Sequence, residues 1–259
     1  MAVITLLTDF GLMDGYVGSM KGVILRISPS VQIVDIAHDI SPGDIDAAAF
    51  VLAQTHTYFP KGTIHVIVVD PGVGSERRAL AVKSPQAFFI APDNGVLKWI
   101  YHYYDDVTVV SLTESHYFLE MSHTFHGRDV FAPVAAHLTT GLSFDKLGQR
   151  ITDYISGSIP VPQQIDRTLT GEIIHVDHFG NLISNVSHQY VFDKKIESIQ
   201  IGEIVLDRLS SSYCEKQIGD PLAIFGSHGY IEVAVNKGNA AQHLNLEKGA
   251  KISIHCASD

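Results

Sequence analysis

The chain has 259 residues, of which 46% are hydrophobic and 18% are charged, and its formal net charge at pH 7 is -10 with His neutral. This composition excludes a disordered chain and indicates a globular protein with one large domain or two ordinary ones. The acidic balance argues against general nucleic-acid binding, which needs a basic surface, and it would tolerate a cationic ligand.

The first half of the chain alternates strand and helix patterns. Residues 2–8 are an apolar run that Asp9 ends, and without a basic flank or cleavage site this run predicts a strand rather than a signal peptide. Further strands are predicted over 31–37, 63–69, 79–82 and 87–91, with helices over 16–27, after 44, after 95 and after 127. This alternation predicts an α/β domain over 1–160, with a mostly parallel sheet that carries helices on both faces.

The character of the sequence changes at S-I-P-V-P-Q-Q (158–164), which is typical of a linker. Beyond it, strand patterns dominate and long helical patterns are absent. The predicted strands are 172–177, 182–186, 197–201, 222–225, 230–235 and 251–255. We therefore expect a second domain over 168–259, an all-β barrel or sandwich.

The remaining global features favour a cytoplasmic protein. No run of about 18 apolar residues predicts a membrane span. Cys214 and Cys256 are interpreted as ordinary thiols rather than as a disulfide framework.

Two carboxylates follow the strongest predicted strands. Asp9 follows the first strand and Asp70 follows the buried strand 63–69. Ligands of open α/β sheets bind beyond the carboxyl ends of the strands, so both are candidate site residues. Asp9 can accept two hydrogen bonds from a ribose diol, or it can simply hold its turn.

The segment after Asp70 predicts a charged pair. Pro71, Gly72 and Gly74 form a tight turn, and Arg77 and Arg78 follow on the returning chain. A guanidinium there can pair with Asp70, either as part of a reactive centre or as a structural salt bridge. His126, between Phe125 and Gly127 at a predicted helix start, is the candidate titrating group.

Close histidines leave a metal site open as an alternative. His116, His123 and His126 are close in sequence, and His175 and His178 flank Asp177. No H-E-x-x-H or C-x-x-C motif supports such a site, so we predict no metal.

Six segments occur in an order that identifies a family. They are T-D-F-G near the start, V-D-P-G-V-G-S-E-R-R, I-A-P-D-N-G (90–95), T-F-H-G-R-D-V-F-A-P, D-H-F-G-N (177–181) and Y-I-E-V-A-V-N-x-G-N-A-A (230–241). Together they resemble the S-adenosyl-L-methionine (SAM) hydrolase family, also called SAM hydroxide adenosyltransferases, which is related to the bacterial fluorinase and chlorinase. The resemblance runs over nearly the whole chain.

The resemblance implies a homotrimer of two-domain subunits, with each site between the N-terminal domain of one subunit and the C-terminal β-barrel of its neighbour. It places the catalytic Asp-Arg-His set on Asp70, Arg77 and His126, with Arg78 as the alternative arginine. It implies that Asp9 binds the ribose hydroxyls, and that Asp177 and Ser227 hold the amino-acid end with Glu232 nearby. Asn181 suits an adenine edge, Phe179 and Tyr213 offer aromatic faces, and the Val235 backbone meets the adenine amino group.

One departure bears on the reaction. The halogenases carry Tyr where this chain has Asp70, and Ser where it has Gly127. A carboxylate at the halide position repels chloride or fluoride and suits water instead. The resemblance therefore implies hydrolysis of SAM to adenosine and L-methionine, by in-line attack of water at the ribose C5′, with no cofactor. The alternatives are an adenosine or SAM-binding protein with little turnover and a metal-dependent nucleoside or phosphate hydrolase.

Overall fold

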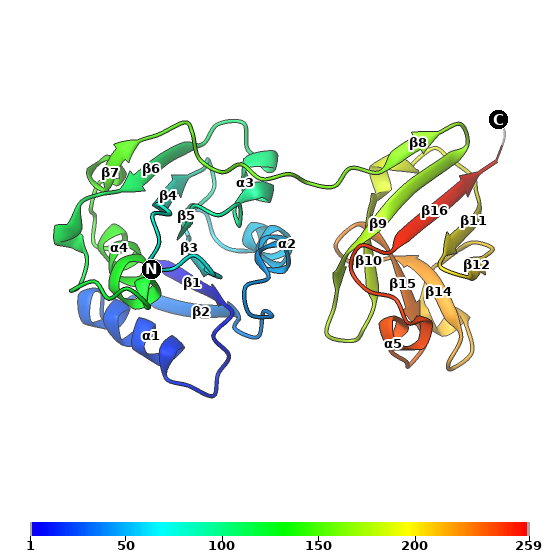
Figure 1. Ribbon diagram of the computed structural model, residues 1–259, viewed down its shortest axis with the longest axis horizontal. Coiled ribbons are helices and arrows are strands. Elements are labelled where there is room, and N and C mark those ends of the chain that lie inside the picture. The colour runs from blue at the N-terminus through cyan, green and yellow to red at the C-terminus, as the bar shows by residue number, and fades with distance from the viewer. Residues whose placement is uncertain (1, 258–259) are drawn as a thin grey trace. The chain divides into compact units, whose positions relative to one another are not determined.

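The computed structural model describes residues 2–257, and these fall into two compact units, one up to Ile159 and one from Pro160 onward. Figure 1 shows both units, the first from blue to green and the second from green to red. None of the described helices is long and apolar enough to cross a membrane.

The first unit is built on a mixed sheet. Its described residues form seven strands in the order β2-β1-β3-β5-β4-β6-β7. The elements are β1 (Val3–Thr8), α1 (Tyr16–Ile27), β2 (Gln32–Ala37), α2 (Ile45–Thr55), β3 (Ile64–Val68), β4 (Ala79–Lys83), β5 (Phe88–Pro92), α3 (Lys98–Tyr103), β6 (Thr108–Leu112), α4 (Ala132–Thr139) and β7 (Gly148–Arg150).

The prediction of a mostly parallel sheet holds only in part. β2, β1, β3, β5 and β6 run in one direction, whereas β4 and β7 run against them. β4 and β5 are joined by only residues 84–87, and so short a connection can join only antiparallel strands.

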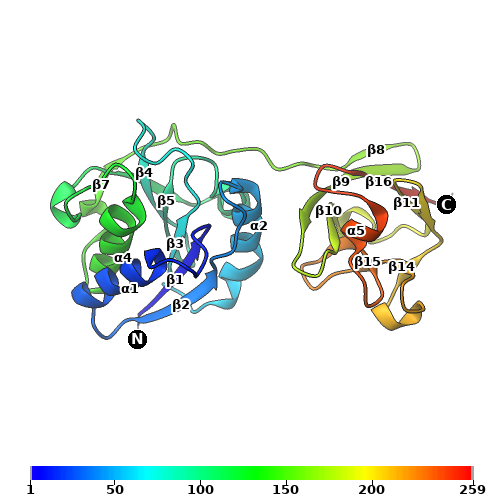
Figure 2. The ribbon, with the colours of Figure 1, turned by 60° about the horizontal axis from the view of Figure 1, so that its bottom comes forward.

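Helices cover both faces of this sheet, as Figures 1 and 2 show. On one face Met20 of α1 and Ala135 of α4 pack with Val66, and on the other Leu52 of α2 and Ile100 of α3 pack with Ile67. The strand β3 supplies both cores because successive side chains point to opposite faces, and all five of its residues are buried. A rigid, fully buried strand therefore leads directly to Asp70.

The second unit is mainly β. A single sheet follows the path β12-β11-β16-β9-β10-β15-β14-β13, with β8 paired to β9. Most of its buried apolar side chains form one core, and Leu222, Ile224 and Ala234 form a separate small cluster. Its elements are β8 (Gln163–Ile165), β9 (Thr168–Val176), β10 (Leu182–Ser187), β11 (Ile196–Ile201), β12 (Ile204–Leu206), β13 (Leu209–Ser210), β14 (Pro221–Phe225), β15 (Tyr230–Val235), α5 (Ala240–Leu244) and β16 (Lys251–Cys256).

The expectation of an all-β domain needs one correction in this unit. The five-residue helix α5 interrupts the strands, and the side chain of Asn239 caps it by accepting a hydrogen bond from the backbone N–H of Gln242. A helix this short leaves too few apolar positions for a recognisable 3.6-residue period.

Candidate active site

The candidate site lies where the connections of the first sheet diverge. From β1 the chain crosses to β2 on one side, whereas β3 lies on the other side of β1. The carboxyl ends of β1 and β3 therefore border the crevice where open α/β sheets bind ligands. Asp9 follows β1 by one residue and Asp70 follows β3 by two, which brings both predicted carboxylates to this crevice.

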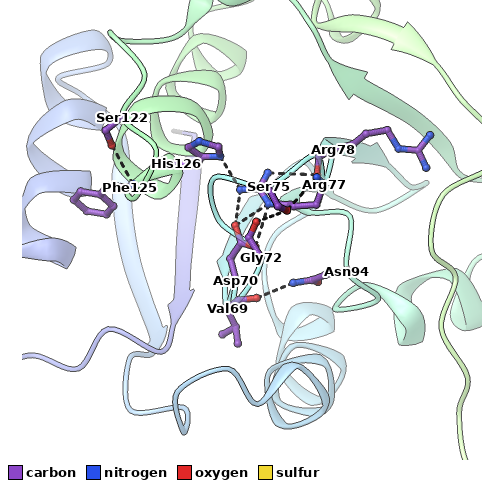
Figure 3. A network of polar contacts seen from close by, with 10 residues as sticks. All are labelled: Val69, Asp70, Gly72, Ser75, Arg77, Arg78, Asn94, Ser122, Phe125 and His126. Atoms are coloured by element: carbon purple, nitrogen blue, oxygen red, sulfur yellow. Dashed lines mark hydrogen bonds and ion pairs between the residues drawn. The ribbon is translucent and has the colours of Figure 1, made fainter.

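Asp70 is held by Arg77 (Figure 3). The Nε of Arg77 lies 3.0 and 2.9 Å from the two carboxylate oxygens, and Nη2 lies 2.5 Å from Oδ2. The Asp70 side chain is 4% exposed and that of Arg77 is 10% exposed. A buried carboxylate needs such compensation, and this side-on, two-nitrogen contact fixes its orientation as well as its charge.

His126 completes the group. Arg77 Nη2 donates to His126 Nδ1 at 2.7 Å. Because a guanidinium can only donate, Nδ1 is unprotonated and the neutral imidazole carries its hydrogen on Nε2. Burial, followed by the charge of Arg77, lowers the pKa of His126 below 6.5, in agreement with this neutral form.

Contacts of the residues that follow His126 hold this part of the chain in place. Gly127–Phe131 is a π-helical turn that leads into α4, an irregularity that is common at functional sites. Asp129 is fully buried, pairs with Arg128 at 2.6 Å and accepts a hydrogen bond from the Ser122 backbone. This network holds the loop that contains His126.

A cavity of about 50 Å³ adjoins Asp70 and His126. Its walls include Asp70, His126, Asp9, Phe10 and Gly127. This space is large enough for an ordered water and lies beside the charged oxygens that a water would bind. A Cβ at Gly127 would lie 3.3 Å from the Phe125 ring and 3.4 Å from a Val68 methyl group, and both of these residues line the cavity.

A wider pocket of about 380 Å³ shares three wall residues with this cavity. Both are lined by Phe10, Thr124 and Phe125, and the wider one also by Tyr16 and Arg128. The rings of Phe10, Tyr16 and Phe125 pack against one another with centroids 5.3 to 5.8 Å apart. An aromatic wall thus continues outward from the reactive carboxylate.

Asp9 holds a neighbouring loop. Its Oδ2 accepts a hydrogen bond of 2.8 Å from the backbone N–H of Gly43, which has a φ of +75°. Asp9 therefore shapes its turn and also faces the cavity, so the two sequence-based interpretations of this residue are compatible.

In the second unit, Asp177 organises the turn between β9 and β10. Its Oδ1 accepts from the backbone N–H groups of Phe179 and Asn181 at 2.9 and 2.8 Å, and its Oδ2 accepts from the Asn181 side chain at 3.0 Å. The turn presents Phe179 outward with 72% of its surface exposed, whereas Asn181 is buried.

Glu232 lies buried on β15 between two partners. The Tyr213 hydroxyl donates to its Oε1 at 2.5 Å, and His228 Nε2 lies 3.0 Å from its Oε2. Burial raises the pKa of Glu232, but the hydrogen bonds of His228 and Tyr213 outweigh this effect and hold it below the usual value. Burial and the same hydrogen bond raise the pKa of Tyr213 to about 12, and Asp177 contributes to that rise. The Asp177 turn and the Tyr213–Glu232 pair are therefore electrostatic neighbours.

The other two predicted residues lie at the ends of this strand. Ser227 is exposed in the loop between β14 and β15. Val235 ends β15, and its carbonyl accepts a hydrogen bond from Gly238 N at 2.9 Å.

Three features were missed or left open by the sequence. Arg77 rather than Arg78 pairs with Asp70, because Arg78 turns to Asp93 and Asp153. His228 was not predicted to be a site residue. The sequence nevertheless places it four residues before Glu232, in a segment with a turn followed by a strand. Within residues 2–257, no three His, Cys, Asp or Glu side chains are grouped in a way that could hold a metal ion.

Comparisons with known proteins cover nearly the whole chain. A family model described as the SAM hydroxide adenosyltransferase N-terminal domain matches residues 4–148, and its C-terminal counterpart matches residues 171–253. An (R)-S-adenosyl-L-methionine hydrolase of Salinispora arenicola is 35% identical over 97% of both chains. A fluorinase of an Actinoplanes species is 28% identical, also over 97% of both chains. The crystal structure of an uncharacterized conserved protein from Thermotoga maritima is similar with a TM-score of 0.90 and 35% identity, over 97% of this chain and 99% of that one.

Proposed function

We infer that this chain, which belongs to the SAM hydroxide adenosyltransferase family, is an enzyme that hydrolyses S-adenosyl-L-methionine to adenosine and L-methionine. Among the residues of the site, the main support for this conclusion is the buried Asp70–Arg77 pair beside a water-sized cavity.

The proposed reaction is an in-line displacement at the ribose C5′. A water oxygen forms a bond to C5′ while the C5′–S bond breaks, and its electron pair stays on sulfur. Methionine then leaves as a neutral thioether, so no general acid is needed. What the enzyme must supply is a positioned water and an acceptor for its proton.

Asp70 is the proton acceptor in this proposal, and His126 is not. The Nδ1 of His126 already accepts from Arg77, and its Nε2 carries the hydrogen, so the imidazole has no free lone pair for water. The two oxygens of Asp70 offer about four acceptor positions, and three Arg77 contacts do not use all of them. Arg77 and His126 then orient Asp70 and the water.

The same carboxylate disfavours halide as nucleophile. Chloride or fluoride in the 50 Å³ cavity would meet the anionic Asp70 and would find no side chain at Gly127 to bind it. We therefore propose hydrolysis rather than halogenation, although a fluorinase is among the relatives.

The substrate-binding residues are proposed as the resemblance implies them. Asp9 binds the ribose hydroxyls, while Asp177, Ser227 and Glu232 hold the amino-acid end. Asn181, Phe179, Tyr213 and the Val235 backbone bind the adenine. The carboxylates of the second unit support this proposal, because SAM carries positive charge on its sulfonium and ammonium groups.

We also propose that the chain acts as a homotrimer in which the second unit of one subunit completes the site of its neighbour. Light scattering at assay concentration should give three times the 28.3 kDa chain mass. A fully active monomer would contradict this part of the proposal.

Chromatography of SAM incubated with the protein, with and without chloride, tests the function. Adenosine with or without chloride supports the hydrolase. A 5′-chloroadenosine product would indicate a halogenase, and no product with retained SAM would indicate a binding protein. Loss of activity with a chelator would indicate a metal-dependent hydrolase, whereas our proposal includes no metal. Separate reactions with the two sulfonium epimers ask whether the (R) preference in the Salinispora relative's name extends to this chain.

A further inference from the structure

Two adjacent residues, Asp93 and Asn94, contact both ends of the loop that carries Asp70 and Arg77. They follow β5 directly, in the segment I-A-P-D-N-G, and neither lines the cavity at Asp70. Asp93 is 4% exposed. The proposed reaction leaves both without a role.

Asn94 holds the start of the loop, as Figure 3 shows. Its side-chain Nδ2 donates to the carbonyl of Val69, the residue before Asp70, at 2.9 Å. Its Oδ1 accepts from Val96 N at 3.2 Å, which fixes the orientation of the amide. The neighbouring Pro92 has no N–H to offer strand β3, so the side chain provides a donor that the backbone lacks there.

Asp93 holds the end of the loop. Its Oδ2 accepts from Nε and Nη2 of Arg78 at 2.9 and 2.7 Å, and its backbone N–H donates to the Arg78 carbonyl at 2.9 Å. Arg78 follows Arg77 directly. The carbonyl of Val69 and the backbone and guanidinium of Arg78 are thus anchored to neighbouring residues of one rigid strand end.

We propose that Asp93 and Asn94 form a clamp, here called the 93–94 clamp, that sets the distance between Asp70 and Arg77. They are positioning residues for the hydrolysis, and this inference rests on the proposed function. The loop between the anchors has tight geometry of its own, because Gly74 has a φ of +79° and a Cβ there would lie 2.4 Å from the His123 carbonyl oxygen. A displacement of about 1 Å at a reacting group can cost about a hundredfold in rate, so a loosened anchor should lower turnover without removing a substrate contact.

The first variant is Asn94→Ala, with Asn185→Ala as its matched control. Asn185 also donates to a carbonyl through Nδ2, to Pro160, and accepts from a backbone N–H through Oδ1, from Glu172. We expect Asn94→Ala to lower kcat at least tenfold with KM for SAM within about threefold of the native value. Asn185→Ala should keep native kcat even where its melting temperature falls further.

The second readout does not depend on turnover. In the native protein the Arg77 contact helps to lower the pKa of His126. The charge of Asp70 raises the same pKa. If the clamp sets the positions of both groups, Asn94→Ala should shift the pKa of His126 measured by nuclear magnetic resonance, with the resonance assigned from a His126→Gln sample. Should native protein fail to hydrolyse SAM, the function would be wrong, but this titration would still test the clamp.

Asn94→Asp covers the case in which the alanine variant does not fold. It keeps the size of the side chain and the acceptor for Val96 N, but places an acceptor against the Val69 carbonyl. A folded Asn94→Asp protein with reduced kcat and a shifted His126 pKa supports the clamp. Native kcat and an unchanged His126 titration in either folded variant, or an equal loss of kcat in Asn185→Ala, would overturn it.

Discussion

Asp70 in the first unit and Glu232 in the second are buried carboxylates that are stabilised in different ways. Asp70 in the first unit contacts a guanidinium through two nitrogens, so its charge is balanced before any ligand arrives. Glu232 in the second unit contacts a tyrosine hydroxyl and a histidine, and the Nδ1 of that histidine accepts a hydrogen bond from the Tyr230 N–H. Glu232 is therefore held by single hydrogen bonds from a hydroxyl and an imidazole, and not by the two nitrogens of a guanidinium.

In the proposed mechanism this difference gives the two carboxylates different roles. A balanced carboxylate beside a small cavity can orient water and take its proton. A buried carboxylate that no guanidinium contacts favours a cationic ligand, and we propose that Glu232 contributes to binding. Substitutions at Asp70 should therefore lower kcat, whereas substitutions at Glu232 should raise KM.

The largest effect is expected for Asp70→Asn. The amide cannot take a proton from water, and general-base catalysis typically contributes about 10² to 10⁴ in rate, so kcat for adenosine formation should fall about 10³-fold. The SAM dissociation constant, measured by calorimetry, should change by less than about threefold. Asp145→Asn, which alters an exposed carboxylate paired to Arg150, is the control and should keep native turnover.

A smaller effect is expected for Glu232→Gln. Hydrogen bonds to charged groups contribute about 1.5 to 3 kcal/mol, so loss of the charge should raise KM for SAM by tenfold or more while kcat changes less. Glu172→Gln, at an exposed Lys251 pair on the same unit, is the matched variant. A fall in kcat with unchanged KM would show that the two carboxylates do not divide the work as proposed.

The pH dependence of the first unit provides a third prediction. Neutral His126 accepts from Arg77, and its pKa lies below 6.5 because of burial and then the charge of Arg77. Turnover should therefore persist below pH 6.5 and fall only as pH passes through the lowered His126 pKa, where a proton on Nδ1 would face the guanidinium. His126→Gln, with a side-chain oxygen that can still accept, should lack this acidic limb in a kcat profile. An unchanged limb would mean that another group controls it.

The smallest predicted effect concerns stability. His65 is fully buried in the first unit, and burial, followed by the charge of His56, lowers its pKa from 6.5 to about 3. The unfolded chain therefore takes up a proton first, and folding stability contributed by neutral His65 is lost as pH falls from 6.5 toward 3. Between pH 7 and 4.5 the native protein should lose about 2 kcal/mol more unfolding free energy than His65→Gln. Urea denaturation at both pH values measures this, and exposed His243→Gln should behave like native protein.

Local sequence patterns predicted much of the first unit and the core of its site. The unpunctuated β-branched run before Asp70 marked the central strand, and Asp9 and Asp70 were located by the rule that ligands bind beyond strand ends. The choice between Arg77 and Arg78 was not predictable, because adjacent side chains leave the chain in opposite directions and only the fold shows which one faces Asp70.

Contacts that depend on strand order could not be predicted from the sequence. Asn94 reaches Val69 because β5 lies next to β3, although 25 positions separate the two residues. Tyr213 reaches Glu232 across 19 positions in the same way. Hydrophobic periodicity does not show which strands are adjacent. The clamp and the Tyr213–Glu232–His228 group could therefore be identified only in the structure.

The most direct test of the central claim is the oxygen source in a single turnover. Excess enzyme is mixed with SAM in ¹⁸O-labelled water, and the adenosine is analysed by mass spectrometry. If Asp70 holds water for attack on C5′, the first adenosine formed should carry ¹⁸O at its 5′ position. Unlabelled adenosine, with ¹⁸O instead in the Asp70 carboxylate, would show that Asp70 attacks C5′ itself and would contradict the account.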